Sequence, residues 1–252
     1  ISLDDLDKDG WVLNCQNGTL DLRTGKLRPH AREDLITKMA PVDFDPNATC
    51  PLFGGVIARA TGDDAELAAY IQRSLGYGLT SDTSEECLFV WHGTGRNGKG
   101  TILETVRTAM GDYVSTTPVA TLLQKGGSGI PNDLAALKGV RLVPPGDTRG
   151  RRRYLEQNAA CAVYGCRSRG RTGPWIKEEN PTEGIARRFY WLLASCLAWQ
   201  KQGGLNEPDA VKQATAAYRK EEDSLSEFLE AETITAKGLH EPPDRVTVAC
   251  ST

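Results

Sequence analysis

The stretch FVWHGTGRNGKGTILETV, residues 89–106, constrains the fold of this chain more than any other segment. An apolar run precedes Gly93, Gly95 and Gly98, and an apolar repeat with helical spacing follows Lys99. Glycines let backbone N–H groups approach an anion closely, and a helix N-terminus attracts negative charge. The pattern therefore predicts a strand, a phosphate-binding loop and a helix in succession.

The segments on both sides of the loop suit this arrangement. Residues 86–92 are largely apolar without helical periodicity, which is typical of a buried strand in a parallel sheet. The predicted helix runs from Thr101 to Met110, and Gly111 ends it. Its apolar face consists of Ile102, Leu103, Val106, Ala109 and Met110.

One position departs from the usual phosphate loop G-x-x-x-x-G-K-[ST]. The residue after the lysine normally supplies a hydroxyl to magnesium, and here it is Gly100. Thr101 lies about 100° further round the helix, so its hydroxyl can replace the missing one only if the end of the loop shifts. The alternative interpretation is a glycine-rich connection with a surface lysine.

Composition limits the remaining possibilities. The chain has 252 residues and 39% hydrophobic content, enough for one large domain or two small ones. Its net charge of -3 shows no global basic excess, so a nucleic-acid site must be a local patch. No apolar run is long enough to span a bilayer, and the seven cysteines include no C-x-x-C pair. We expect a reduced, cytoplasmic protein without a membrane partner.

Local patterns predict further elements. The turn dipeptides Asn17-Gly18 and Thr24-Gly25 separate VLNC, TLDL and KLR, which indicates a small antiparallel hairpin unit. Residues 41–51 are expected to form a loop. Asp63 or Asp64 caps a helix through Leu75, with Gly76 as its stop.

The second half of the chain also carries recognisable patterns. Val140–Val143 is a candidate second core strand, which Pro144-Pro145 ends. Residues 185–202 predict a largely buried helix, and residues 208–220 predict another, capped by Asn206. A capping box of Ser224 and Glu227 predicts a further helix start.

Three stretches together resemble the C-terminal part of phage and plasmid primases, a superfamily 3 helicase related to the poxvirus primase-helicase. They are LNCQNGTLDLRTGKL (13–27), DTSEECLFVWHGTGRNGKGTILETVRTAMGDY (82–113) and IPNDLAALKGVRLV (130–143). The resemblance implies an α/β fold, a P-loop NTPase with a parallel sheet flanked by helices. It divides the chain into an N-terminal hairpin and helical region (1–80), the NTPase core (81–200, divergent at 149–180) and a helical tail (201–252) toward a winged-helix segment.

The resemblance also implies roles for individual residues. ATP phosphates would be bound by Gly93, Gly95, Asn97, Gly98, Lys99, Gly100 and Thr101. Magnesium would be held by Thr101 and Asp147, and catalysis would use Lys99, Asp147 and an arginine pair, Arg187 and Arg188. The implied partners are single-stranded DNA and further copies of the chain in a hexameric ring. The missing hydroxyl at Gly100 resembles a family variant in which glycine follows the lysine and threonine comes next.

Several of these assignments have plain alternatives. Asp147 lies behind two prolines and is about as well explained as a loop aspartate. Arg187 and Arg188 also fit a solvated helix face. Asn180 is either the remnant of a polar sensor residue at a strand end or an ordinary loop residue.

Residues 149–171 match nothing in the family and are rich in arginine. One interpretation is a patch that pairs with nucleic-acid phosphates, although few aromatic side chains accompany it. The other is a deletion or a shifted reading frame, which the abrupt change between two family-like flanks favours. That interpretation implies impaired catalysis.

The resemblance therefore implies an ATP-dependent DNA helicase module acting in phage or plasmid replication, impaired if the sensor and DNA-contacting segment is lost. Three alternatives stay open: an ATP-binding remnant that does not hydrolyse, a phosphate-loop kinase acting on a small metabolite, and an oligomerisation or DNA-binding fragment without a nucleotide role.

Overall fold

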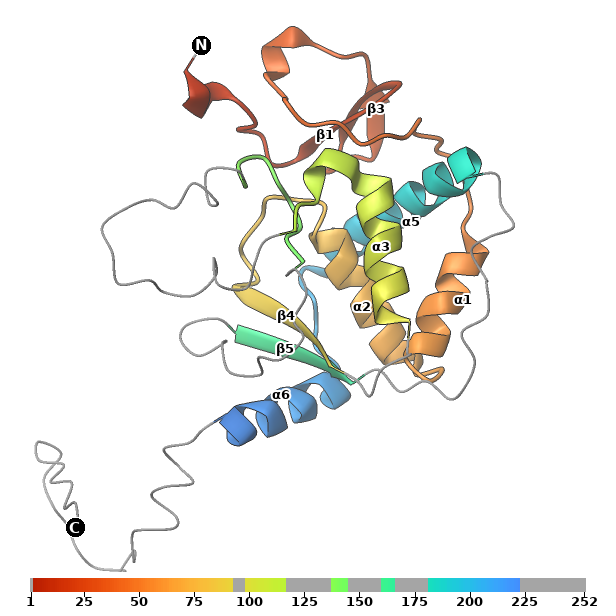
Figure 1. Ribbon diagram of the computed structural model, residues 1–252, viewed down its shortest axis with the longest axis vertical. Coiled ribbons are helices and arrows are strands. Elements are labelled where there is room, and N and C mark those ends of the chain that lie inside the picture. The colour runs from red at the N-terminus through yellow and green to blue at the C-terminus, as the bar shows by residue number, and fades with distance from the viewer. Residues whose placement is uncertain (1, 93–97, 117–136, 145–159, 166–180, 223–252) are drawn as a thin grey trace, which may run out of the picture.

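Two small sheets lie at opposite ends of a group of helices (Figure 1). The computed structural model describes residues 2–92, 98–116, 137–144, 160–165 and 181–222. The helices between the sheets are α1 (Pro51–Ala60), α2 (Ala65–Tyr77), α3 (Lys99–Met110) and α5 (Pro181–Gln202). Three short 3-10 turns, η1 (Leu3–Asp5), η2 (Arg32–Asp34) and η3 (Gly111–Tyr113), join the longer elements. The described residues thus form a mixed α/β fold.

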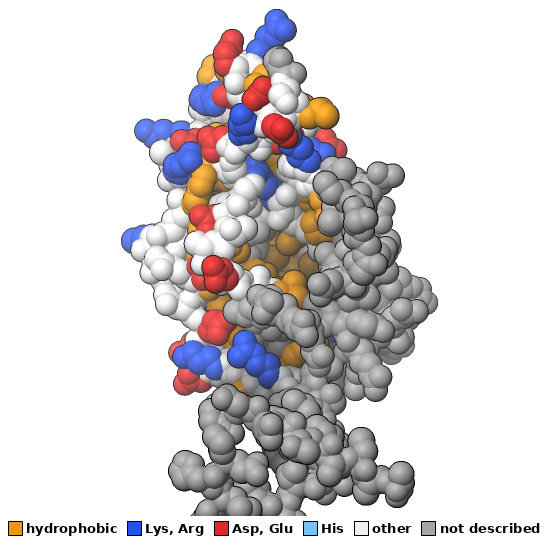
Figure 2. All heavy atoms as spheres, turned by 90° about the vertical axis from the view of Figure 1, so that its left-hand side faces the viewer, with side chains coloured by type: hydrophobic (Ala, Val, Ile, Leu, Met, Phe, Trp, Pro, Cys, Tyr) orange, Lys and Arg blue, Asp and Glu red, His pale blue; other side chains and the backbone are white. Residues whose placement is uncertain are grey.

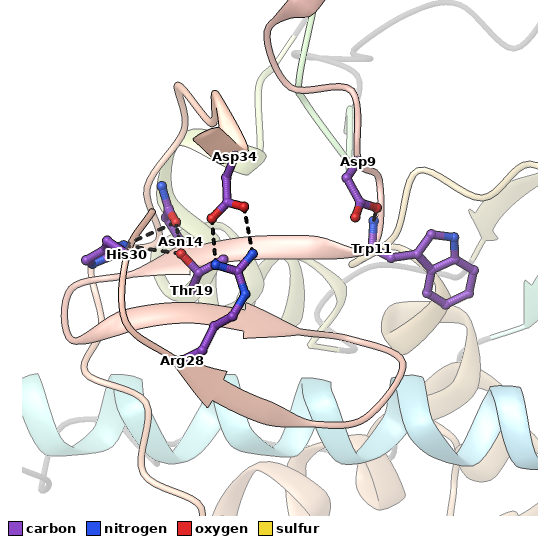
Figure 3. Close-up of polar contacts among 7 residues, drawn as sticks. All are labelled: Asp9, Trp11, Asn14, Thr19, Arg28, His30 and Asp34. Atoms are coloured by element: carbon purple, nitrogen blue, oxygen red, sulfur yellow. Dashed lines mark hydrogen bonds and ion pairs between the residues drawn. The ribbon is translucent and has the colours of Figure 1, made fainter. Parts of the chain in front are cut away.

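The N-terminal sheet confirms the predicted hairpin unit. Its strands are β1 (Val12–Cys15), β2 (Gly18–Asp21) and β3 (Lys26–Arg28), paired antiparallel in chain order. The alternation of the strands buries Leu13, Cys15 and Leu20, and Leu22 just after β2 is buried as well. The amide of Gln200 on α5 donates to the Leu22 carbonyl at 2.8 Å, so α5 lies under this sheet (Figure 3).

Helix α2 packs against α5 along the centre of the molecule. The Asp64 carboxylate caps α2 by accepting from the Leu67 N–H at 3.0 Å, as predicted. Gly76, however, is not the stop: α2 continues to Tyr77, and Gly78 is the C-cap. A Cβ at position 76 would lie 2.3 Å from the Cys196 nitrogen, so Gly76 is required by the close approach of α5 rather than by a turn.

Helix α1 was not predicted, because residues 41–51 were expected to be a loop and no helix was expected directly after it. Pro51 occupies its first turn, where a missing N–H costs nothing. Phe53, Ile57 and Ala60 are buried, and the Phe53 ring meets Trp191 of α5 edge-on at a centroid distance of 4.8 Å. The helix is short and Gly54-Gly55 interrupts its apolar pattern, so the sequence gives little indication of it.

Helix α3 confirms the predicted helix after the glycines and its end at Gly111, which adopts φ 55. The buried face differs in one position. Thr105 is buried, with its hydroxyl bonded to the Thr101 carbonyl at 2.7 Å, whereas Leu103 is only half-buried.

The second sheet pairs β4 (Cys87–His92) with β5 (Ala160–Gly165) in parallel, Cys87 opposite Ala160 and His92 opposite Gly165. Strand β5 comes from within the arginine-rich stretch that matched nothing in the family. The side chains of β4 from Cys87 to Trp91 are half-buried rather than fully buried. The prediction of a core strand at Val140–Val143 was wrong, because Leu142 forms a single parallel bridge with Val114 and does not pair with β4.

The C-terminal helices are confirmed with shifted limits. Helix α5 begins four residues before the expected start, at Pro181, and α6 spans Asp209–Glu222. Asn206 is not the cap of α6, since it has φ 49 and the carbonyl of Pro208 accepts from the Val211 N–H at 2.9 Å. The Glu85 carboxylate fixes the turn before α6 by accepting from Trp199 Nε1 at 2.5 Å and from the Leu205 N–H at 3.1 Å.

Candidate functional site

The candidate site is the start of α3, directly after the glycine-rich segment. Gly98 is the N-cap with φ 82, a left-handed conformation that favours glycine, and Lys99 is the first helical residue. Because glycine has no side chain, the cap offers no side-chain acceptor to the N–H groups of the first turn. Such N–H groups, together with the helix dipole, bind phosphate oxygens. Gly93, Gly95 and Asn97 lie outside the described residues.

The first turn of α3 presents the remaining predicted phosphate and magnesium residues. Lys99 is half-buried, while Gly100 and Thr101 are exposed. A Cβ added at Gly100 would meet no atom within 4 Å, so the position where phosphate loops carry a hydroxyl is open space here. Thr101 carries the only hydroxyl among the first three residues of α3. Asp147, the other predicted magnesium ligand, lies outside the described residues.

These residues supply part of what a phosphate-bound magnesium ion requires. Such an ion takes most of its ligands from phosphates and water and needs only one or two protein oxygens. Within the described ranges, no group of three or more His, Cys, Asp or Glu side chains is arranged to hold a metal ion. The Thr101 hydroxyl is the kind of single ligand that a nucleotide-bound magnesium needs.

The structure does not bring the arginine pair to the start of α3 within one chain. A Cβ at Gly98 would lie 3.9 Å from the Ala60 side chain, at the end of α1. Trp191, one turn after Arg187 on α5, contacts Phe53 at the beginning of α1. Phe53 and Ala60 are about 10 Å apart along that helix, and Figure 1 shows α5 starting near the beginning of α1. The pair thus lies at the opposite end of α1 from Lys99, with Arg187 exposed.

The far end of α3 carries a residue that the sequence analysis did not single out. Tyr113 is 1% exposed, and its hydroxyl accepts from the Asn14 N–H at 2.8 Å and donates to the Lys38 carbonyl at 3.1 Å. Burial raises the pKa of this phenol, which therefore stays protonated. Its position two residues after the helix-ending Gly111 is the only sequence signal that pointed to it.

A group of polar side chains on and beside the N-terminal sheet includes Asn14, which contacts the same end of α3 (Figure 3). Thr19 donates to the Asn14 side-chain oxygen at 2.7 Å, and His30 Nδ1 lies 3.3 Å from both groups. Arg28 forms two bonds to Asp34 at 2.7 and 2.8 Å, and these hold the pKa of the Asp34 carboxyl below its usual range. These polar groups form hydrogen bonds with one another, and these bonds hold the side chains in place.

On the face drawn in Figure 2, the described charged side chains do not form a patch of a single sign. Figure 2 shows acidic and basic side chains intermixed on the face that it draws. The arginine-rich residues 149–159 and 166–171 lie outside the described residues, as does Asn180. Among the described helices, none combines the length and the apolar content needed to cross a bilayer.

Comparison with known proteins found a similarity in the N-terminal part of the chain. Residues 1–62 match the family model described as "D5 N terminal like". That match covers the N-terminal sheet, its loops and α1. It agrees with the resemblance inferred from the hairpin and the glycine loop, although it does not itself cover the loop.

A curated relative extends the similarity. The "Putative helicase L207/L206" of Acanthamoeba polyphaga mimivirus is 28% identical over 149 residues, 56% of this chain. This alignment spans only 15% of that protein. The two findings support a D5-like viral primase-helicase relationship.

Proposed function

We propose that this chain is the nucleotide-binding module of a D5-like primase-helicase, which hydrolyses ATP to unwind DNA during replication. The observation that carries the proposal is the order strand β4, glycine-rich segment, α3, with Lys99 at the first helical position and Gly98 left-handed before it. The D5 N terminal like match and the helicase-named relative support the same class. Because the chain matches only 15% of that relative, the activity of the whole protein is part of the proposal.

In the proposed site, the backbone from Gly93 to Gly100 surrounds the phosphates and Lys99 neutralises their charge. Magnesium, held by Thr101 and Asp147, would neutralise further charge on the phosphates. The β4–β5 pair would form part of a larger parallel sheet of the P-loop NTPase type. We propose single-stranded DNA as the polymer that is moved.

The arginine pair is proposed to act on a neighbouring copy of the chain. Arg187 and Arg188 lie at the opposite end of α1 from Lys99, so they do not serve the site of their own chain. In a ring, each subunit's arginines would face the γ-phosphate bound by the next subunit and stabilise the charge that develops during transfer. This arrangement requires an oligomer, which we propose to be hexameric.

A second candidate function is a remnant that binds ATP without hydrolysing it. It is favoured by the failure of Val140–Val143 to form a strand beside β4, since Asp147 should follow that strand. Without a correctly placed carboxylate, the attacking water is not oriented.

Calorimetry and turnover assays test both candidates. We expect wild-type protein to bind ATP with magnesium, and Lys99→Ala to abolish that binding. Lys212→Ala, a change at an exposed residue of α6, is the matched control and should bind normally. Turnover that rises with single-stranded DNA supports the helicase, whereas binding without turnover supports the remnant. Absence of saturable binding to the wild-type protein would refute both.

A further inference from the structure

Helix α3 joins the candidate nucleotide site to the N-terminal sheet. Its first residue is Lys99, and the η3 turn that follows it ends at Tyr113. A helix of 12 residues is about 18 Å long. Its buried face, which includes Ile102, Val106 and Met110, packs into the single hydrophobic cluster of the described residues. The helix therefore joins the two ends through one packed face.

The far end of α3 is fastened to the segment before α1. Asp112 exchanges two hydrogen bonds with Met39, its N–H donating to the Met39 carbonyl and its carboxylate accepting from the Met39 N–H, both at 3.2 Å. A Cβ at Gly111 would lie 2.3 Å from the Pro41 ring, so the helix end sits directly against this segment. The Tyr113 hydroxyl adds its bonds to Asn14 and Lys38.

Asn14 extends this connection into the sheet. Its N–H faces Tyr113, its carbonyl accepts from the Ala40 N–H at 2.8 Å, and its side chain accepts from Thr19. The adjacent Gln16 N–H donates to the Val42 carbonyl at 2.8 Å. The outer edge of β1 is thus closed by Tyr113 and residues 40–42, so part of its hydrogen bonding comes from the end of α3.

We propose that Tyr113 is a positioning residue that couples nucleotide occupancy at the start of α3 to the order of the N-terminal sheet. The inference rests on the proposed function. Phosphate binding to the first turn of α3 reduces the motion of the helix, and the Tyr113 hydroxyl passes that restriction to β1. Coupling of this kind is reciprocal, so loosening the Tyr113 contact weakens nucleotide binding.

Hydrogen exchange with a non-hydrolysable ATP analogue and magnesium tests the coupling. The reporters are the amides of Gln16 and Ala40, whose bonding partners the test variant leaves in place. We expect the analogue to slow their exchange in the wild-type protein. Tyr113→Phe keeps the ring but removes the hydroxyl, so it should reduce the nucleotide-dependent slowing and raise the dissociation constant roughly two- to tenfold.

Tyr70→Phe is the matched control, because Tyr70 is also a buried tyrosine, on α2, with its hydroxyl 3.5 Å from Glu207. It should keep the wild-type response, and circular dichroism checks that both variants are folded. If the analogue binds but the reporter amides exchange equally with and without it, the coupling is refuted while the proposed function stands. The coupling through Tyr113 is also refuted if the phenylalanine variant retains the full response. If the analogue does not bind at all, the proposed function itself fails.

Discussion

Gly76 of α2 lies directly against the backbone of Cys196 on α5, so that a Cβ at residue 76 would be 2.3 Å from the Cys196 nitrogen. It would also lie 2.7 Å from the Ser195 carbonyl oxygen. Both contacts are with backbone atoms of α5, which cannot rotate away as a side chain can. This crossing fixes the separation of the two helices that support the N-terminal sheet and α3.

We expect Gly76→Ala to lower the free energy of unfolding by about 3 kcal/mol or more, because the methyl group forces α2 and α5 apart. Urea denaturation measures the change. Gly54→Ala on α1 is the control, since a Cβ there meets no atom within 4 Å. That change should raise stability by about 0.5 to 1 kcal/mol, because glycine is a poor helix former. A neutral Gly76→Ala would contradict the observed helix crossing.

A second prediction concerns the open space at Gly100. Gly100→Ser should be accommodated without strain and, if the loop binds ATP as proposed, should tighten binding in the presence of magnesium by supplying the usual hydroxyl ligand. Gly100→Ala, which adds the methyl group without the hydroxyl, should not. Titrations with and without magnesium distinguish the two. Equal affinities of the two variants would show that position 100 does not face the metal.

A third prediction tests the arginine pair by mixing subunits. The double variant Arg187→Ala, Arg188→Ala and the single variant Lys99→Ala should each lose ATP turnover, the former by about a thousandfold or more. Mixed together, they should regain part of it, because a Lys99→Ala subunit supplies arginines to an intact neighbouring site. Turnover retained by the arginine variant alone, or no recovery on mixing, would argue against a role between subunits.

The fourth prediction is a loss of stability at alkaline pH. Burial raises the pKa of the Cys15 thiol to about 12 and that of Cys196 to about 11, from an ordinary value of 9.0. Below pH 9 both thiols are protonated in the folded and unfolded chain, so their contribution is fully present. Above it the unfolded chain releases protons that the folded chain retains, and stability falls as pH approaches the folded values.

The expected loss is roughly 1.4 kcal/mol per thiol for each pH unit between about 9 and 11. Burial raises the pKa of Tyr77 to about 12, which adds to the slope above pH 10. Chemical denaturation at a series of pH values measures it. Cys15→Ala combined with Cys196→Ala should reduce the slope, and an unchanged slope would show that these thiols do not cause it.

Local signals predicted the elements that depend on neighbouring residues. The turn dipeptides at Asn17-Gly18 and Thr24-Gly25 gave the three antiparallel strands, and the helical spacing after Lys99 gave α3 with its end at Gly111. Each of these depends on backbone preferences and side-chain periods within a few residues, so each is encoded in a short window. The candidate phosphate site, from Gly93 to Thr101, is also a contiguous run, so a short window was enough to propose it.

The sequence alone determined the hairpin, the capped start of α2 and the helix after the glycines, because turn chemistry, capping and periodicity act locally. The tertiary structure decided that Gly76 serves a helix crossing, that β5 rather than Val140–Val143 pairs with β4, and that Tyr113 closes the edge of β1. These features join residues that lie far apart in the chain, and their energies come from packing and hydrogen bonds between elements. No local pattern specifies which distant backbone will approach a glycine or a hydroxyl, so only the folded chain could show it.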